Sequence, residues 1–201
     1  MAIAPGTTIA DYLVPTRATR GKTLVRDGIL VIGASLLFAL SARVSMPLGF
    51  TPVPITLQTL VVMLVGAALG SRRGALAALL YLAEGATGLP VFASGGGLLY
   101  LLGPTAGYLW SYPIAAFVVG WLCERGLDRS FATSLLAMLP GSIIIYLIGV
   151  PWLAFVVHLS LGQALVAGLL PFIPGDIIKV IIAAALLPTA WKFVHRAERE
   201  S

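Results

Sequence analysis

Asp176 and Lys179 are the two residues whose types and spacing most clearly permit ligand chemistry. They follow Pro174 and Gly175, which mark the start of a helix, so Asp176 is expected in the first turn, where the helix dipole favours an anion. The spacing of three residues puts Lys179 on the same face of that helix, one turn further along. The two side chains either neutralise each other or form a polar pocket that offers an anionic acceptor and a cationic donor together.

A second candidate group lies in residues 51–59, with the sequence TPVPITLQT. Its two prolines favour an extended loop, and Thr56, Gln58 and Thr59 are expected in the first turns of the helix that follows. The threonines can act as caps of the helix start. Gln58 is the stronger candidate for a ligand contact, because an amide among apolar residues needs partners for both its oxygen and its nitrogen.

Arg43, Glu84 and several aromatic residues complete the candidate set. Arg43 is expected near the outer end of an apolar segment, where it either reaches the lipid headgroups or holds a carboxylate with its planar guanidinium. Glu84 lies within another apolar segment and needs a proton or a partner there. The aromatic residues either form a belt at the membrane interface or provide flat walls for a heterocycle. They are Tyr100, Tyr108, Trp110 and Tyr112.

Enzyme signatures are missing from the sequence. It has no H-E-x-x-H, C-x-x-C or G-x-x-x-x-G-K-[ST] motif, so neither a zinc peptidase nor a P-loop ATPase is indicated. Its single cysteine, Cys123, excludes an intramolecular disulfide and a metal site made of cysteines. An intramembrane enzyme that uses Glu84 and Asp176 on a lipid is the remaining enzymatic alternative. It would need a metal-binding cluster or a nucleophile–base pair, and we predict no metal site and no catalytic residues.

The elements that position these residues belong to a protein whose solvent is the bilayer. Of the 201 residues, 59% are apolar and 10% are charged, and the mean hydropathy is +0.99, whereas soluble domains are about 25% charged. A chain of this size has too little interior to hide so much apolar surface from water. Most of the 13 Lys and Arg residues stand in short flanks, so membrane anchoring explains the net charge of +5 better than nucleic acid does.

Six apolar segments approach the length that crosses the hydrocarbon core as a helix, about 20 residues. They predict an all-α integral membrane protein with a six-helix domain at 27–191. Cytoplasmic tails are expected at 1–26 and, with a basic composition, at 192–201. The predicted spans are 27–46, 55–70, 74–92, 105–123, 131–150 and 174–191.

The placement of the basic residues indicates the number and direction of the spans. Most of them lie in the N-terminal tail, in the second and fourth connections, or in the C-terminal tail. The other connections, near 47–54, 93–104 and 151–173, carry no Lys, Arg, Asp or Glu. With six spans, both termini and these basic clusters are cytoplasmic, as the positive-inside rule expects. The apolar segment 155–171 is then predicted to be a re-entrant or interfacial helix on the outer side.

Small residues at a spacing of four indicate where helices approach closely in a membrane. Gly66 and Gly70 form a GxxxG motif that Gly74 continues, and Ser35 and Ala39 form a milder pair on the first span. Packing within one chain explains most such pairs.

Four segments carry a family resemblance. They stand in order between residues 30 and 188 and are 51–59 (TPVPITLQT), 85–93 (GATGLPVFA), 103–108 (GPTAGY) and 171–179 (PFIPGDIIK). Together they resemble the BioY family, the biotin-specific substrate-binding (S) components of energy-coupling factor (ECF) transporters. The resemblance implies a six-helix protein that captures biotin from the outer side of a bacterial or archaeal cytoplasmic membrane. An S component for another vitamin, of the thiamine or riboflavin type, is the alternative.

The resemblance also implies partners. In that family the S component joins a coupling transmembrane protein and two ABC-type ATPases, which supply the energy, and biotin is a transported ligand rather than a cofactor. Whether this chain uses a dedicated or a shared coupling module, or works without one as a homo-oligomer, stays open. Many S components contact the coupling protein through an Ala-x-x-x-Ala pair, for which Ser35 and Ala39 are the nearest match.

On the same analogy, Asp176 and Lys179 match the polar pair of the family. The ureido ring of biotin has two N–H donors and one carbonyl acceptor, and its valerate chain ends in a carboxylate. Asp176 is expected to accept from a ureido N–H, Lys179 to donate to the ureido carbonyl, and Gln58 to do either. Arg43 is expected to hold the carboxylate, with the outer loops as the alternative. The rest of the predicted substrate-binding set is Thr56, Glu84, Tyr100 and Tyr108.

Overall fold

Helices make up most of the computed structural model, which describes residues 7–14 and 20–200. The α-helices are α1 (Ile9–Leu13), α2 (Arg20–Arg43), α3 (Gln58–Leu69), α4 (Ser71–Ala86), α5 (Ala106–Leu122), α6 (Phe131–Val157), α7 (Leu161–Gly168) and α8 (Ile173–Glu200). The other elements are the strands β1 (Ser45–Met46) and β2 (Ile55–Thr56), the 3-10 turn η1 (Tyr100–Leu102) and the π-helical turn η2 (Cys123–Leu127). The parts of the predicted N-terminal tail at 1–6 and 15–19 lie outside the described residues.

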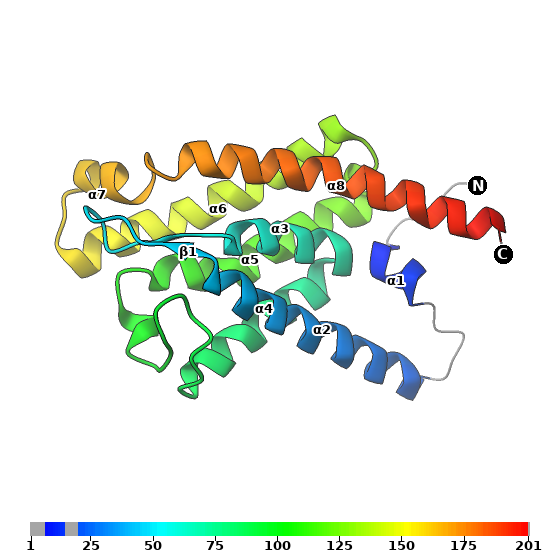
Figure 1. The fold of residues 1–201 in the computed structure, drawn as a ribbon, viewed down its shortest axis with the longest axis horizontal. Helices are drawn as coiled ribbons and strands as arrows, with labels where there is room; N and C mark the ends of the chain where they lie inside the picture. Colours follow the sequence, from blue (N-terminus) through cyan, green and yellow to red (C-terminus); the bar gives the residue numbers. More distant parts are fainter. Residues whose placement is uncertain (1–6, 15–19, 201) are drawn as a thin grey trace.

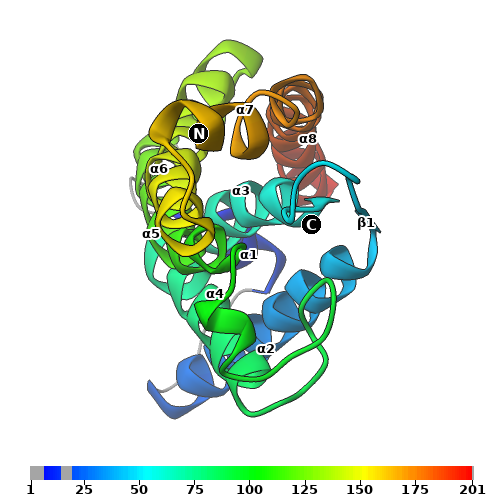
Figure 2. The ribbon, with the colours of Figure 1, turned by 90° about the vertical axis from the view of Figure 1, so that its left-hand side faces the viewer.

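The helices run back and forth between the two ends of an elongated bundle (Figure 1). The β1–β2 hairpin and α7 lie at one end, which we call the hairpin end. Helix α1 and the C-terminal part of α8 lie at the other, the α1 end. Viewed toward the hairpin end, α3 lies in the centre of the bundle (Figure 2), where it contacts α2, α4, α5, α6 and α8.

Helices lie within all six predicted spans, but they differ in length. Four helices of the described residues are long and apolar enough to cross a membrane, at Gly21–Arg43, Ala106–Leu127, Phe131–Val157 and Ile173–Val194. Helices α3 and α4 contain 12 and 16 residues, which makes them about 18 and 24 Å long at 1.5 Å per residue. Both are therefore shorter than the hydrocarbon core of about 30 Å.

The β1–β2 hairpin corrects the predicted boundary between the first two spans. Its strands replace the end of the first predicted helix and the start of the second, and they pair antiparallel with Ser45 opposite Thr56. Pro52 and Pro54 lie in the loop of the hairpin. Because a residue before proline avoids the helical region, these two prolines keep the chain extended up to β2. Thr56 is thus a strand residue and not part of a helix start.

Four other predicted boundaries also move. Helix α4 ends at Ala86, and residues 87–105 form a loop at the hairpin end instead of completing a span to residue 92. Within the segment 155–171, residues 155–157 continue α6, and only α7 is a separate helix. Its eight residues make it about 12 Å long, too short to cross the membrane. Helices α2 and α8 extend into the predicted tails, because they begin at Arg20 and end at Glu200.

Glycines allow α3, α4 and α5 to touch backbone to backbone. A Cβ atom on Gly66 would lie 2.5 Å from the carbonyl oxygen of Ala116 in α5 and one on Gly74 would lie 3.0 Å from the Cα of Gly66. A Cβ on Gly120 would lie 2.5 Å from the carbonyl carbon of Gly70. Gly70 itself has a φ of +86° at the break between α3 and α4, a conformation that glycine adopts without strain. The GxxxG spacing therefore marks packing within one chain, with Gly70 as the turn.

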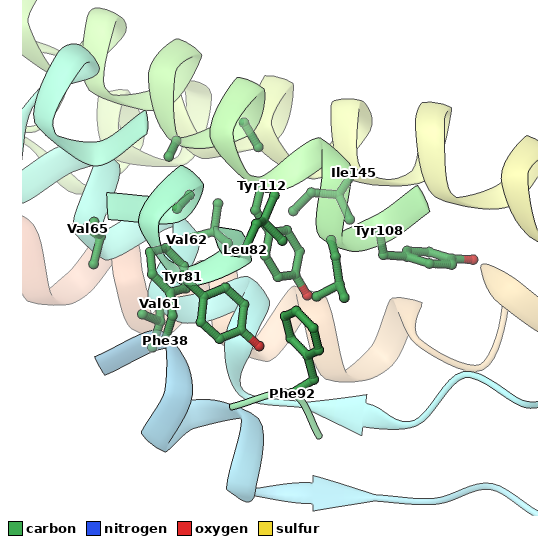
Figure 3. Packing of buried hydrophobic residues seen from close by; sticks show 14 of the residues in the cluster. Phe38, Val61, Val62, Val65, Tyr81, Leu82, Phe92, Tyr108, Tyr112 and Ile145 are labelled. Atoms are coloured by element: carbon green, nitrogen blue, oxygen red, sulfur yellow. The ribbon is translucent and has the colours of Figure 1, made fainter. Parts of the chain in front are cut away.

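Aromatic side chains fill the core toward the hairpin end (Figure 3). The ring of Phe38 in α2 stacks on Tyr81 of α4 at 5.6 Å between centroids and lies 6.3 Å from that of Tyr112 in α5. Tyr81 in turn meets the edge of Phe92, from the 87–105 loop, at 5.3 Å. This cluster joins α2, α4, α5 and the 87–105 loop into one body next to the hairpin.

Ion pairs attach the short helix α1 to the α1 end of the bundle. Asp11 of α1 accepts hydrogen bonds from the Nη2 atom of Arg73 in α4 at 2.9 Å and lies 3.2 Å from a guanidinium nitrogen of Arg26 in α2. Beside it, Tyr12 meets the edge of the Trp191 ring of α8 at 5.3 Å. Helix α1 thus contacts side chains from α2, α4 and α8.

These contacts change the pKa of Asp11. Burial raises it, but the hydrogen bonds from Arg73 and Thr8 and the charge of Arg73 outweigh burial and hold the pKa of Asp11 below its ordinary value of 3.8. A carboxylate whose folded-state pKa is lowered stabilises the fold above its unfolded-state pKa and loses that contribution as the pH falls through the folded value.

We expect the Asp11→Asn variant to melt a few degrees below wild type at pH 7, because about 1 kcal/mol shifts the melting temperature of a protein of this size by about 2–4 °C. The difference should shrink as the pH falls below 3.8, where the unfolded chain takes up a proton on Asp11, and vanish once the pH is also below the lowered pKa of the folded carboxylate. Melting curves of both proteins between pH 3 and 7 measure this. A difference that does not change with pH would contradict the ionic role of Asp11.

Candidate functional site

A cluster of four polar side chains lies at the start of α8. The Oδ1 atom of Asp176 is 2.8 Å from the ammonium nitrogen of Lys179. Thr59 of α3 accepts a hydrogen bond from Lys179 at 3.0 Å, and its hydroxyl lies 3.3 Å from Asp176 Oδ1, to which it donates. The hydroxyl of Tyr146 in α6 donates to the other carboxylate oxygen, Oδ2. We call these four residues the Asp176 cluster.

The sequence explains why Asp176 and Lys179 point together into the bundle. Helix α8 begins at Ile173, and Pro174 occupies its first turn, where a proline costs no hydrogen bond. Asp176 is in this first turn, near the positive end of the helix dipole. Both charged side chains are buried, with 7% exposure each. Removing one partner of such a pair leaves the other as an unpaired buried charge, which is strongly unfavourable.

The Asp176 cluster lines a small cavity, the polar cavity, which has a volume of about 40 Å³. Its wall is built by the hairpin loop, α3, α5, α6 and α8 with the residue before it. The lining residues are Val53, Pro54, Thr56, Thr59, Tyr108, Tyr112, Ile145, Tyr146, Phe172, Asp176 and Lys179. Sites for small molecules usually have volumes of about 300–1,000 Å³, so a vitamin-sized ligand requires the walls of the polar cavity to move apart.

Aromatic rings form much of the wall of the polar cavity. Tyr108 and Tyr112 come from successive turns of α5, and Phe172 precedes α8. The hydroxyl of Tyr108 donates a 2.7 Å hydrogen bond to the carbonyl of Gly168 at the end of α7, which fixes the ring. The cavity therefore combines one charged pair and several hydroxyl groups with flat apolar walls, a combination that suits a ring with polar edges.

Gln58 and Arg43 lie in a second polar region, beneath the 87–105 loop. The Gln58 amide donates a 2.7 Å hydrogen bond to the hydroxyl of Tyr81, which donates to the carbonyl of Val91 at 3.3 Å. At the end of α2, Arg43 donates to the carbonyl of Pro90. Both side chains thus hold the loop that follows α4.

Glu84 and Ser35 meet at the interface of α4 and α2. The Ser35 hydroxyl donates to Glu84 Oε1 at 2.9 Å and Glu84 Oε2 is buried without a hydrogen-bond partner among the described residues. Ser35 is fully buried and Ala39 half-buried. In this structure the predicted contact pair therefore faces α4 and the core. The exposed apolar side of α2 is formed by other residues, among them Ile29, Ile32, Leu36 and Leu40.

The structure brings four of the predicted substrate-binding residues together and separates the other four. Asp176, Lys179, Thr56 and Tyr108 line the polar cavity. The residues outside its lining are Gln58, Arg43, Glu84 and Tyr100. Tyr100 stacks on the ring of Phe92, with 4.8 Å between centroids, and so belongs to the 87–105 loop.

Tyr146 is the polar residue of the cavity lining that the sequence analysis did not single out. It lies near the outer end of the predicted span 131–150, where a tyrosine is readily explained as part of an interface belt. Its partner, Asp176, is 30 residues away in sequence, and only the packing of α6 against α8 brings the two together. The one available signal was a phenol among the apolar residues of α6, which needs a hydrogen-bond partner when it is buried.

Comparisons with known proteins agree on one family. A model of the BioY family matches residues 14–196. The chain is 44% identical over 170 residues to the biotin transporter BioY of Rhizobium etli, covering 80% of this chain and 90% of that protein. It is 42% identical over 166 residues to the biotin transporter BioY of Thermotoga maritima, covering 82% and 93%.

A solved structure has the same fold. It is the crystal structure of the S-component for biotin from an ECF-type ABC transporter, which superposes with a TM-score of 0.77 at 29% sequence identity. The match covers 87% of this chain and 95% of that one.

Proposed function

The chain belongs to the BioY family, and we propose that it captures biotin for uptake as the S component of an ECF-type transporter. The observation that carries the proposal is the Asp176 cluster, a buried ion pair with two hydroxyls in a cavity with aromatic walls. Such a cavity offers acceptors and donors side by side, as a ureido group requires. The protein is a transport component and not an enzyme.

In this proposal the polar edge of the biotin ring meets the Asp176 cluster. The Asp176 carboxylate accepts from one ureido N–H, and Lys179 donates to the ureido carbonyl. Both groups exchange part of their present bonding, with each other and with Thr59, for bonds to the ligand. Tyr108 and Tyr112 supply flat apolar surface on one side of the ring.

We also propose that six helices cross the membrane, with both ends of the chain cytoplasmic; they are α2, α3, α4, α5, α6 and α8. Helices α3 and α4 are short, but α3 is surrounded by other helices, so little of it meets lipid. Arg72 and Arg73 follow the α3–α4 break at the α1 end, and Arg125 and Arg129 lie near η2. This distribution of charge supports a cytoplasmic α1 end, since basic residues concentrate there. The hairpin end then faces outward, in a bacterial or archaeal cytoplasmic membrane.

The expected partners follow from the same assignment. A coupling transmembrane protein and two ABC-type ATPases would supply the energy for release, and the exposed apolar side of α2 offers a surface within the membrane for the coupling protein. Purification with the ATPases from cells that express both would test this assembly. A homo-oligomer without ATPases is the alternative outcome of that experiment.

Isothermal titration of biotin into the purified protein tests the function. We expect saturable binding with one site per chain, and none with thiamine or riboflavin at the same concentrations. Binding of one of these vitamins without binding of biotin, by protein with a cooperative melting transition, would overturn the proposal in favour of another vitamin.

A further prediction concerns Arg43, to which we assign the carboxylate of biotin. Movement of the 87–105 loop would free its guanidinium from Pro90. Wild type should then bind biotin more tightly than the neutral biotin amide, by about 10-fold or more, the range of a charge-assisted hydrogen bond. In Arg43→Ala this preference should disappear. If the variant weakens both ligands equally, Arg43 holds the loop and another group binds the carboxylate.

A further inference from the structure

A wide apolar groove runs along the outside of the bundle between α6, α7 and α8. Its volume is about 800 Å³. Apolar side chains from all three helices form its walls, and we define it as the α6–α8 groove by Leu139, Ile143, Leu147, Leu165, Ile177 and Ile181. Each of these six side chains is exposed on the surface of the protein.

The occupant of the α6–α8 groove follows from where it lies. Helices α6 and α8 are two of the four helices that are long and apolar enough to cross a membrane. Apolar side chains of this kind, exposed along such helices, face the acyl chains of the bilayer. The groove continues this lipid-facing surface inward, so the chemistry that fits it is an acyl chain.

The α6–α8 groove reaches the polar cavity at one place. Of the residues that line the two spaces, Tyr146 and Asp176 are the ones they share. The Tyr146 hydroxyl donates to Asp176 Oδ2, and this contact bridges α6 and α8 at that level. The Tyr146 ring meets the edge of Tyr108 at 6.3 Å between centroids, which supports it from the cavity side.

We propose that the Tyr146 side chain is the wall that keeps membrane acyl chains in the α6–α8 groove out of the polar cavity. The proposal rests on the assignment of the polar cavity as the substrate site. A cavity with a charged pair and apolar walls would otherwise admit fatty acyl chains, which are abundant in a membrane, in competition with a scarce vitamin. Tyr146 is thus a positioning and specificity residue: its ring excludes lipid, and its hydroxyl holds the Asp176 carboxylate toward the cavity.

Photo-labelling with a fatty acid that carries a diazirine at its chain end tests whether Tyr146 excludes acyl chains from the polar cavity. The experiment needs no biotin. In wild type we expect labelled peptides from α6 and α8 and none from α3, because Thr59 of α3 lines only the polar cavity. In Tyr146→Ala, α3 should also be labelled. Tyr146→Phe keeps the ring, so its pattern should match wild type. Ile145→Ala enlarges the polar cavity without opening the wall, since Ile145 does not line the groove, and it should match wild type too.

Competition with oleate gives the second measurement. At increasing oleate, the Kd for biotin should rise at least about fivefold in Tyr146→Ala and stay within about twofold of its starting value in wild type, Tyr146→Phe and Ile145→Ala, as expected for simple mass action. Adding Leu139→Trp to Tyr146→Ala narrows the groove and should reduce both the labelling of α3 and the competition.

The outcomes separate this proposal from the function on which it rests. Labelling of α3 in wild type would contradict the proposed role of Tyr146 as a barrier. Absence of labelling of α3 in folded Tyr146→Ala would contradict it too. Absence of label from α6 and α8 in wild type overturns the acyl chain as the occupant of the groove. If wild type fails to bind biotin but the labelling follows the expected pattern, Tyr146 is a barrier to acyl chains and the ligand of the polar cavity is not biotin.

Discussion

Asp176→Asn is expected to weaken biotin binding by at least about 100-fold, or about 2.8 kcal/mol. Two losses add up in this variant. The ligand loses a charged acceptor for its ureido N–H, and the Lys179 ammonium, which is 7% exposed, loses the anion that lies 2.8 Å away. Truncating one member of a buried, hydrogen-bonded charge pair at an interface costs about 2–5 kcal/mol, which covers the expected effect.

Titration calorimetry on Asp176→Asn, Lys179→Ala and Thr59→Val measures the effect. Lys179→Ala should lose affinity to a similar degree, because it leaves the Asp176 carboxylate without its cation. Thr59→Val removes a neutral hydroxyl from the same cluster and is the matched control, with an expected loss of about 10-fold or less. Wild-type affinity in folded Asp176→Asn would remove the ureido role of Asp176 and move the site elsewhere.

Gly120→Ala is expected to have a large effect on folding, with a destabilisation of about 1–3 kcal/mol or a failure to fold. The added Cβ would lie 2.5 Å from the carbonyl carbon of Gly70 and from the backbone nitrogen of Ser71, and 2.7 Å from the carbonyl oxygen of Gly66. These are backbone atoms at the crossing of three helices, so no side-chain rotation can relieve the contact. Gly66→Ala should behave similarly, since its Cβ would meet the carbonyl oxygen of Ala116 at 2.5 Å.

The control for this prediction is Gly33→Ala. Gly33 lies within α2, and a Cβ there would meet nothing within 4 Å. Alanine also favours the helix over glycine by about 1 kcal/mol, so the melting temperature should stay the same or rise. Thermal melting and size-exclusion chromatography of the three variants in one detergent provide the measurement. Equal losses in Gly33→Ala and Gly120→Ala would show that the close crossing is not the cause.

The sequence was sufficient for the features that depend on local signals. The start of α8 is marked by Pro174 and Gly175, and the spacing of Asp176 and Lys179 then brings the two side chains onto one face. Family membership was equally accessible, because four short segments in a fixed order carry it, and it is confirmed by relatives that are 44% and 42% identical.

Features that depend on packing between helices were not accessible in this way. Ser35, which the resemblance matched to a partner-contact pair, is buried against Glu84. In a soluble helix, polar residues mark the exposed face, but a membrane helix is apolar on both faces, so α2 carries no such mark. Tyr146 was missed for the same reason, since its role depends on which face of α6 meets α8.

The strands between α2 and α3 could not be predicted from the sequence either. The β1–β2 hairpin contains only two residue pairs, Ser45 with Thr56 and Met46 with Ile55. So short a run of alternating residues cannot be distinguished from the end of an apolar helix by its periodicity.

The hairpin makes movement at the two ends of the bundle differ in speed. Val53 and Pro54, in its loop just before β2, form part of the wall of the polar cavity, and a two-stranded hairpin held by so few pairs is only marginally stable by itself. Loops of this kind open on timescales of about nanoseconds to microseconds. A ligand arriving at the hairpin end therefore waits only for a small, fast movement. On the proposed orientation, release toward the α1 end would instead require contacts between the long helices to rearrange, so we expect capture to be faster than delivery.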